Sequence, residues 1–121
     1  MKLYIAPFLL YAVTVMAADL TGKWSGSFRA EGADHSISQL IILKQQGGTL
    51  SGSAGPDTSE QYPIENGTVD GNKATFAVTT GEWNFAYALT LKENSLSGDL
   101  TLESTTERRK AKVTLTRTNQ N

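Results

Sequence analysis

The chain has no cysteine, and that absence excludes several kinds of chemistry. Without thiols it has no disulfide framework, no thiolate metal ligand, no cysteine nucleophile and no cysteine to carry a lipid anchor. With 121 residues it has the size of one domain, which can bury a core without disulfides. Because many small eukaryotic secreted domains carry disulfides, their absence favours a bacterial protein.

Histidine occurs only once, as His35, and this also limits the chemistry. A Ser-His-Asp triad or a zinc site needs further well-placed partners, which one histidine without cysteine does not supply. We therefore expect no metal site and no cofactor. His35 is expected to lie in water beside Asp34, at the start of a strand.

Two pairs of carboxylates are candidates for a glycosidase-like acid and base: Glu60 with Glu65, and Asp99 with Glu103. The residues around both pairs are polar, so nothing in the sequence would raise the pKa of one acid. We expect both pairs to be solvated, with no catalytic residue, and the protein not to be an enzyme.

A strong excess of charge of one sign is also missing, since the formal net charge is −1 at pH 7. This balance argues against nucleic acid or an anionic membrane as the partner. Arg108, Lys110 and Lys112 alternate and so form a basic stripe on one face of a strand. The stripe would suit an anion or a polysaccharide, but we favour a charged outer face that maintains solubility.

The long apolar run of the chain is confined to its N-terminus. Lys2 precedes an apolar stretch from Leu3 to Val15, and Val15-Met16-Ala17 has the small-x-small pattern of a signal peptidase site. The alternative, a retained membrane anchor, would need about 20 apolar residues. We predict a signal peptide at 1–17 and one domain at 18–121, secreted or periplasmic and free of the membrane after cleavage.

The rest of the chain lacks helix-period stretches and is instead rich in short β-type runs. In 83–91, for example, Trp83, Phe85 and Tyr87 alternate with small or polar residues, which puts the large groups on one face of a strand. The same alternation marks Ala111, Val113 and Leu115. We predict eight strands, at 21–30, 35–45, 49–54, 62–69, 73–80, 82–92, 95–103 and 109–117.

Turn residues separate these predicted strands and favour a sequential antiparallel meander. Gly47-Gly48 and Asp70-Gly71-Asn72 can adopt the positive φ of tight hairpins, Asn94 is expected to do so after Glu93, and Gly81 marks another break. We expect 55–60 to be a surface loop. Gly26, Gly52 and Gly98 lie inside strands, where they mark either bends that close a barrel or relief of crowding.

Both ends of the predicted sheet carry a familiar pairing. Gly22-Lys23-Trp24 opens the first strand and Thr114-Leu115-Thr116-Arg117 ends the last. This resembles the calycin signature shared by lipocalins, fatty-acid-binding proteins and avidins. The resemblance implies an eight-stranded antiparallel meander β-barrel in which Trp24 closes one end and the Arg117 side chain lies across it.

Two further resemblances refine this expectation. Leu20-Thr21-Gly22-Lys23-Trp24 and Trp83-Asn84-Phe85 are similar to avidin strands, but Gly26 and Ala30 stand where that family has the Asn and Ser that contact biotin. Biotin is therefore not expected as the ligand. Nearly all of 18–121 resembles a family of small exported bacterial domains of unknown function, through the runs Gly22-Lys23-Trp24, Leu50-Ser51-Gly52, Pro63 to Asn72, Phe76 and Leu96-Ser97-Gly98.

The barrel interior is the remaining question for function. Trp83, Phe85 and Tyr87 would line a ligand cavity if the interior were hollow, whereas the short strands favour an interior filled by side chains. Our first hypothesis is a non-catalytic binding or accessory domain. The alternative is a carrier of a small molecule, with its pocket inside the barrel.

Overall fold

A computed structural model describes residues 19–118, and within them the regular structure is entirely β. No helix in this part of the chain is long and apolar enough to cross a membrane. The predicted signal peptide at 1–17 lies outside the described residues. The strands are β1 (Gly22–Ala30), β2 (Ile37–Gln46), β3 (Thr49–Asp57), β4 (Glu60–Pro63), β5 (Glu65–Asp70), β6 (Lys73–Thr80), β7 (Trp83–Lys92), β8 (Ser95–Glu103) and β9 (Arg108–Arg117).

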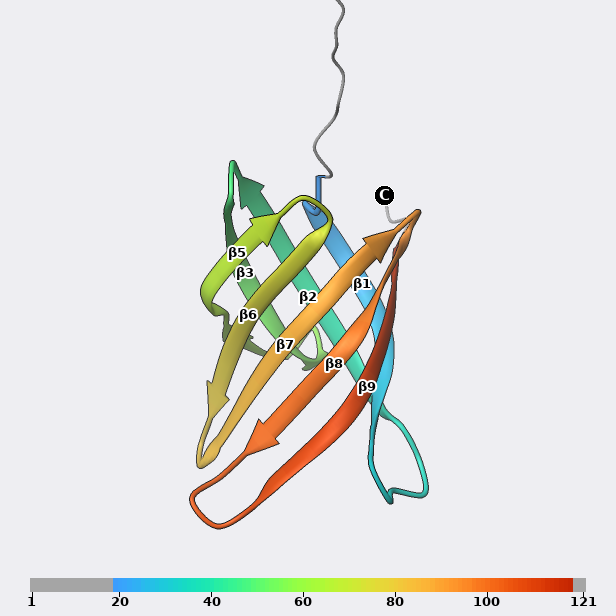
Figure 1. The fold of residues 1–121 in the computed structure, drawn as a ribbon, viewed down its shortest axis with the longest axis vertical. Helices are drawn as coiled ribbons and strands as arrows, with labels where there is room; N and C mark the ends of the chain where they lie inside the picture. Colours follow the sequence, from blue (N-terminus) through green and yellow to red (C-terminus); the bar gives the residue numbers. More distant parts are fainter. Residues whose placement is uncertain (1–18, 119–121) are drawn as a thin grey trace, which may run out of the picture.

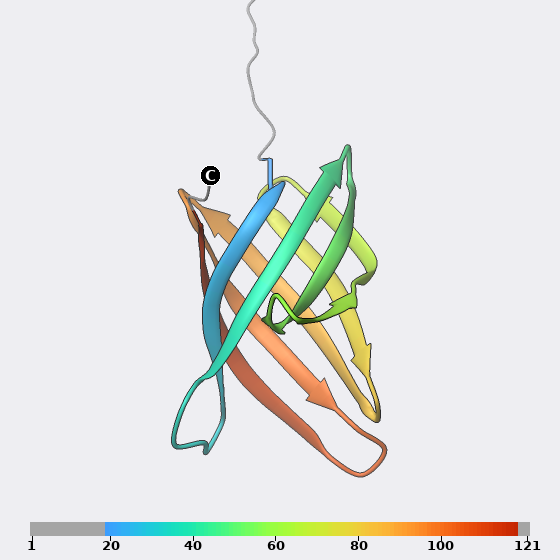
Figure 2. The same cartoon turned by 180° about the vertical axis from the view of Figure 1, so that it is seen from behind.

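Eight of these strands close into an antiparallel barrel, as Figures 1 and 2 show from opposite sides. The order runs β2-β1-β9-β8-β7-β6-β5-β3, and the β2–β3 pairing completes the ring. Most neighbours are also consecutive in sequence, because short turns join them. The predicted fold class, an all-β antiparallel barrel of eight strands, is confirmed, with β4 as one extra strand beside β3.

The region around β4 differs from the sequence prediction. The single strand predicted at 62–69 is divided at Ile64 into β4 and β5. Just after this break, β5 has a register shift against β6 and a φ of +54° at Asn66. The loop predicted at 55–60 is wrong: β3 runs on to Asp57 and β4 begins at Glu60. Pro56 lies in the irregular part of this pairing, where a missing N–H is tolerated.

The turns follow the predicted chemistry at two hairpins and depart from it at a third. Gly47 and Gly71 have φ values of +62° and +65°, as tight hairpins require, and Gly81 also marks a turn, with a φ of +54°. At the β7–β8 hairpin the positive φ belongs to Glu93, at +59°, and not to Asn94 as predicted. The turn is therefore placed one residue earlier than the preference of Asn for this conformation suggests.

Glycine within the strands serves the close approach of neighbouring backbones. A Cβ at Gly26 would lie 1.9 Å from the carbonyl oxygen of Thr114, and one at Gly98 would lie 2.2 Å from that of Ala88. Both positions face the interior by register, opposite Leu115 and Leu89. At these two positions the backbone of the neighbouring strand occupies the space that a Cβ would need.

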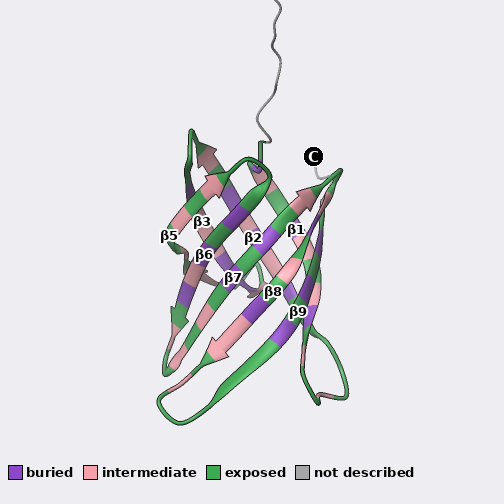
Figure 3. Cartoon of the chain, viewed as in Figure 1, coloured by how far each residue is buried: buried purple, intermediate pink, exposed green. Residues whose placement is uncertain are grey.

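The core follows the alternation along each strand, and Figure 3 shows the resulting bands of buried residues. On β7 the large side chains point inward, with Tyr87 and Leu89 buried and Trp83 and Phe85 half-buried. One half of the barrel is filled by apolar side chains that are almost fully buried, namely Leu20, Trp24, Leu43, Leu50, Leu89, Leu96 and Leu115. This half lies beside the residues at both ends of the described chain, and we call that side the closed end.

Candidate functional site

The closed end is sealed by the pair that the calycin resemblance singles out. Trp24 is fully buried, and its indole Nε1 donates a hydrogen bond to the Leu20 carbonyl at 3.0 Å. The guanidinium carbon of Arg117 lies 4.4 Å from the centre of the Trp24 ring. Arg117 also donates to the carbonyls of Thr21, at 2.9 Å, and Asp19, at 3.1 Å. The structure thus brings Trp24 and Arg117 together, with the arginine tied to the chain segment that crosses this end.

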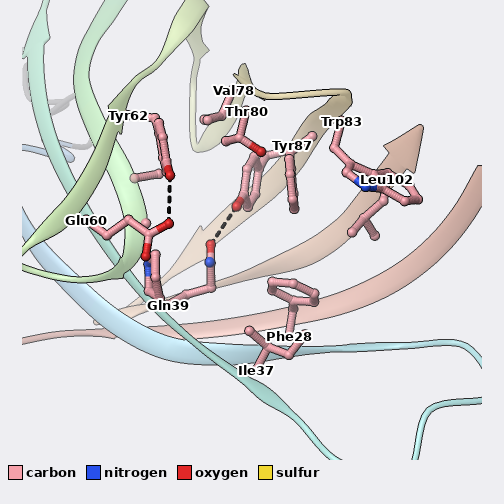
Figure 4. A pocket seen from close by; sticks show the side chains of 14 residues that line it. Phe28, Ile37, Gln39, Glu60, Tyr62, Val78, Thr80, Trp83, Tyr87 and Leu102 are labelled. Carbon is pink, nitrogen blue, oxygen red and sulfur yellow. Dashed lines mark hydrogen bonds between the residues drawn. The ribbon is translucent and has the colours of Figure 1, made fainter. Parts of the chain in front are cut away.

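The other end of the barrel, which we call the open end, is hollow. It contains a cavity of about 300 Å³, a volume at the lower end of the range for small-molecule sites. Figure 4 shows Trp83 and Tyr87 on its wall, and Phe85 lines it as well. The three residues proposed from sequence as ligand contacts therefore share one cavity. The barrel interior is therefore filled by side chains at the closed end and hollow at the open end.

Aromatic rings make up much of the cavity wall. Phe28 from β1 and Phe85 from β7 meet edge to face, with ring centres 6.4 Å apart and planes at 69°. The Tyr87 ring stacks on Phe76, with centres 4.7 Å apart. Such contacts fix the rings in place and present flat apolar surfaces to the space between them.

The inner limit of the cavity is a buried polar pair that the sequence analysis did not identify. Tyr87 Oη donates a hydrogen bond to Gln39 Oε1 at 2.5 Å, and the two residues are only 4% and 7% exposed. Burial raises the pKa of Tyr87, so its hydroxyl stays protonated and remains a donor. Ile41 and Leu89, the next inward residues on the same strands, belong to the filled core.

A signal for Gln39 does exist in the sequence. It stands in the inward series Ile37, Gln39, Ile41, Leu43, where every other member is a large aliphatic residue. A polar side chain on the apolar face of a strand is unusual, because burying an amide without partners costs free energy. The sequence alone does not show that this face of β2 is the interior, whereas the register of β2 against β1 does.

The mouth of the cavity carries the acidic and exposed groups. Glu60 Oε2 accepts a hydrogen bond from Tyr62 Oη at 2.6 Å, and this bond raises the pKa of Tyr62. Ile37, also on the cavity lining, is 49% exposed, the one large apolar side chain so exposed in 19–118. Glu60 is the single ionisable carboxyl among the lining residues, and no Lys, Arg or His is among them.

The wall of the barrel is incomplete next to this cavity. The pairing of β5 with β6 ends at Glu65 and Ala77, so the last part of β6 has no described partner on that side. β4 pairs with β3 across the gap. Tyr62 on β4 and Thr80 on β6 both line the cavity, which therefore reaches the region between these two strands.

The other candidates from sequence lie on the solvated exterior. Lys112 Nζ and Asp99 Oδ1 are 2.6 Å apart, which lowers the pKa of Asp99, and Arg108 stands opposite Glu103. The basic stripe of Arg108, Lys110 and Lys112 is thus interleaved with acids on the neighbouring strand, and all three of its residues are exposed. Glu65 accepts a hydrogen bond from Thr79.

His35 is exposed in the β1–β2 connection. Between residues 19 and 118, no three His, Cys, Asp or Glu side chains gather as a metal site would require. Comparisons with protein-family models, with curated proteins and with solved structures give no match to this chain.

Proposed function

We propose that this protein is a non-catalytic binding protein that holds a small, mainly apolar molecule in the open end of its barrel. The observation that carries the proposal is the cavity of about 300 Å³, walled by aromatic and aliphatic side chains around one buried polar pair. Such a combination of apolar lining and a few fixed polar groups is typical of small-molecule sites.

The volume and the mouth of the cavity agree with this role. An apolar cavity of roughly 150 Å³ is enough to bind benzene, so a space about twice as large accommodates a substituted ring. Ile37 exposes apolar surface at the mouth, where a ligand would cover it. The seal of Arg117 over Trp24 at the opposite end supports a calycin-like carrier with a single entrance.

The competing hypothesis, an accessory domain that binds through its outer surface, has less support. A flat aromatic patch or an unpaired basic patch on the outside would favour it. In the described part of the chain the basic stripe faces acids across β8 and β9, and no large apolar side chain other than Ile37 is strongly exposed. A polysaccharide partner therefore has no evident platform.

Export belongs to the same proposal. A carrier outside the cytoplasm agrees with the signal sequence expected at 1–17 and with a secreted or periplasmic location. Terminal sequencing of the protein recovered from its own cells tests this part, with Ala18 as the expected first residue.

A cavity-filling variant tests the binding proposal. Ala54 is buried and lines the cavity, so Ala54→Leu places three further carbon atoms in the space a ligand would occupy. We expect the neutral fluorophore N-phenyl-1-naphthylamine to brighten on binding the wild-type protein, and its affinity to fall at least roughly tenfold in the variant.

The matched control is Ala86→Leu, which adds the same atoms on the exposed face of β7 and should leave the affinity unchanged. Mass spectrometry under native conditions, on protein from its own host, would show a bound small molecule in the wild type and not in Ala54→Leu. Equal binding of the fluorophore by both variants would refute the interior site.

A further inference from the structure

The cavity carries information about the charge of its ligand, and this inference rests on the function proposed above. Its lining residues include no Lys, Arg or His, while Glu60 stands at the mouth. A carboxylate drawn into this space would lose its water and gain no positive partner, which is strongly unfavourable. It would also pass the negative charge of Glu60. The lining thus disfavours an anionic group inside the cavity.

The polar pair at the inner limit has spare donor capacity, because the Gln39 amide nitrogen carries two N–H groups. Gln39 Oε1 already accepts from Tyr87, and Gln39 Nε2 donates one long hydrogen bond, of 3.5 Å, to the Ser38 carbonyl, where about 2.7–3.2 Å is usual. No other acceptor for this nitrogen is found among residues 19–118. Gln39 is only 7% exposed, and its amide can meet water or a ligand only through the cavity that it lines. Buried donors of this kind are rare unless something accepts from them.

Figure 4 shows the Gln39 side chain beneath Tyr87, on the same wall of the cavity as Phe28 and Ile37. Stacking of Tyr87 on Phe76 holds the pair in position. A ligand whose ring lies between the aromatic walls would therefore bring a substituent to the amide nitrogen. The best substituent is an uncharged acceptor such as a carbonyl oxygen.

We propose that the cavity selects uncharged, ring-containing molecules that present a carbonyl or similar acceptor to the Gln39 amide. Neutral compounds should then bind more tightly than anionic compounds of the same shape. Compounds with an acceptor should bind more tightly than compounds without one. A purely apolar ring also binds, but without the hydrogen bond.

Three probes of nearly one size separate these contributions: acetophenone with a ketone, ethylbenzene with no acceptor, and benzoate with a charge. Binding is followed by the shift of the Trp83 indole N–H signal in ¹H–¹⁵N NMR spectra. We expect acetophenone and ethylbenzene to bind, and benzoate to bind at least roughly tenfold more weakly than acetophenone. Gln39→Leu should weaken acetophenone by about two- to tenfold, the net worth of one hydrogen bond, and leave ethylbenzene unchanged.

A second variant guards against misfolding of the first. Gln39→Leu alone leaves the Tyr87 hydroxyl without its acceptor, whereas Gln39→Leu with Tyr87→Phe removes both polar groups together. Circular dichroism and the thermal midpoint verify that each variant is folded. The double variant should show the same loss of affinity for acetophenone and no loss of affinity for ethylbenzene.

Two kinds of failure are distinguishable. If benzoate binds as tightly as acetophenone, or if both variants weaken ethylbenzene as much as acetophenone, the proposed selectivity is wrong while an interior site stands. If none of the three probes moves the Trp83 signal, the interior site itself is refuted, and the selectivity with it.

Discussion

Single residues give the two ends of this barrel different characters. At the closed end Arg117 combines a contact with the Trp24 ring and two hydrogen bonds to backbone carbonyls. At the inner limit of the cavity, Gln39 and Tyr87 satisfy each other only in part, which leaves a donor for a ligand. The donors of Arg117 are therefore used in closing one end of the barrel, whereas the Gln39 amide inside the cavity can still donate to a ligand.

Replacement of the sealing arginine tests the residue-scale account. The substitution Arg117→Lys keeps the positive charge but removes the planar guanidinium group with its several donors. The lysine therefore cannot stack on the Trp24 ring and donate to both backbone carbonyls at once. We expect the free energy of unfolding to fall by about 1 kcal/mol, measured by urea denaturation. The control Arg108→Lys on the exposed outer face should change it by less than about 0.5 kcal/mol. Equal effects at both positions would show that the Trp24 contact has no special weight.

At the scale of elements, the sequence predicted regular strands better than interrupted ones. The alternation of Trp83, Phe85 and Tyr87 gave β7 and its inward face, because a period of two is a property of the strand alone. The break between β4 and β5 was missed, since both strands pair with β3 and such an interruption is a property of the pairing and not of the local sequence. This break matters for the site, because β4 carries Tyr62 and Glu60 to the cavity mouth.

The candidate site was predictable only in part for the same reason. The aromatic members follow from local alternation, and the pairing of Trp24 with Arg117 follows from the family resemblance. Gln39 could not be assigned from sequence, because its role depends on Tyr87, which lies 48 residues away in the chain. The cavity itself depends on side-chain volumes from several strands at once, which no single run of residues encodes.

The stability of the β3–β4 hairpin at the cavity mouth should depend on pH through Asp57. Hydrogen bonds from the Ser59 hydroxyl and backbone N–H lower the pKa of Asp57 in the folded state. A lowered folded pKa means stabilisation that is present above the ordinary aspartate pKa of about 4 and is lost as pH falls through the folded value. Asp57→Asn should therefore be less stable than the wild type at neutral pH, with the difference disappearing in strong acid.

Thermal unfolding of both proteins across the acid range measures this. Asp19 and Asp99 also have lowered pKa values, so the informative quantity is the difference between the wild type and Asp57→Asn at each pH. A difference that stays constant from neutral to strongly acid pH would mean that the charge of Asp57 contributes nothing to the turn.

At the scale of the whole molecule, the barrel is asymmetric along its length. Its only two tryptophans mark the two halves: Trp24 is fully buried in the filled half, and Trp83 lines the hollow half. Because the closed end is sealed, a ligand would enter through the open end. The gap between β4 and β6 widens that route into the wall.

The most direct test of this asymmetry uses xenon, which enters empty apolar cavities whatever their natural ligand. Under xenon pressure, ¹H–¹⁵N NMR spectra should show a saturable shift of the Trp83 indole N–H. The Trp24 indole N–H, bonded to the Leu20 carbonyl in the filled half, should not move. Shifts of equal size at both tryptophans, or none at Trp83, would contradict a barrel that is packed at one end and hollow at the other.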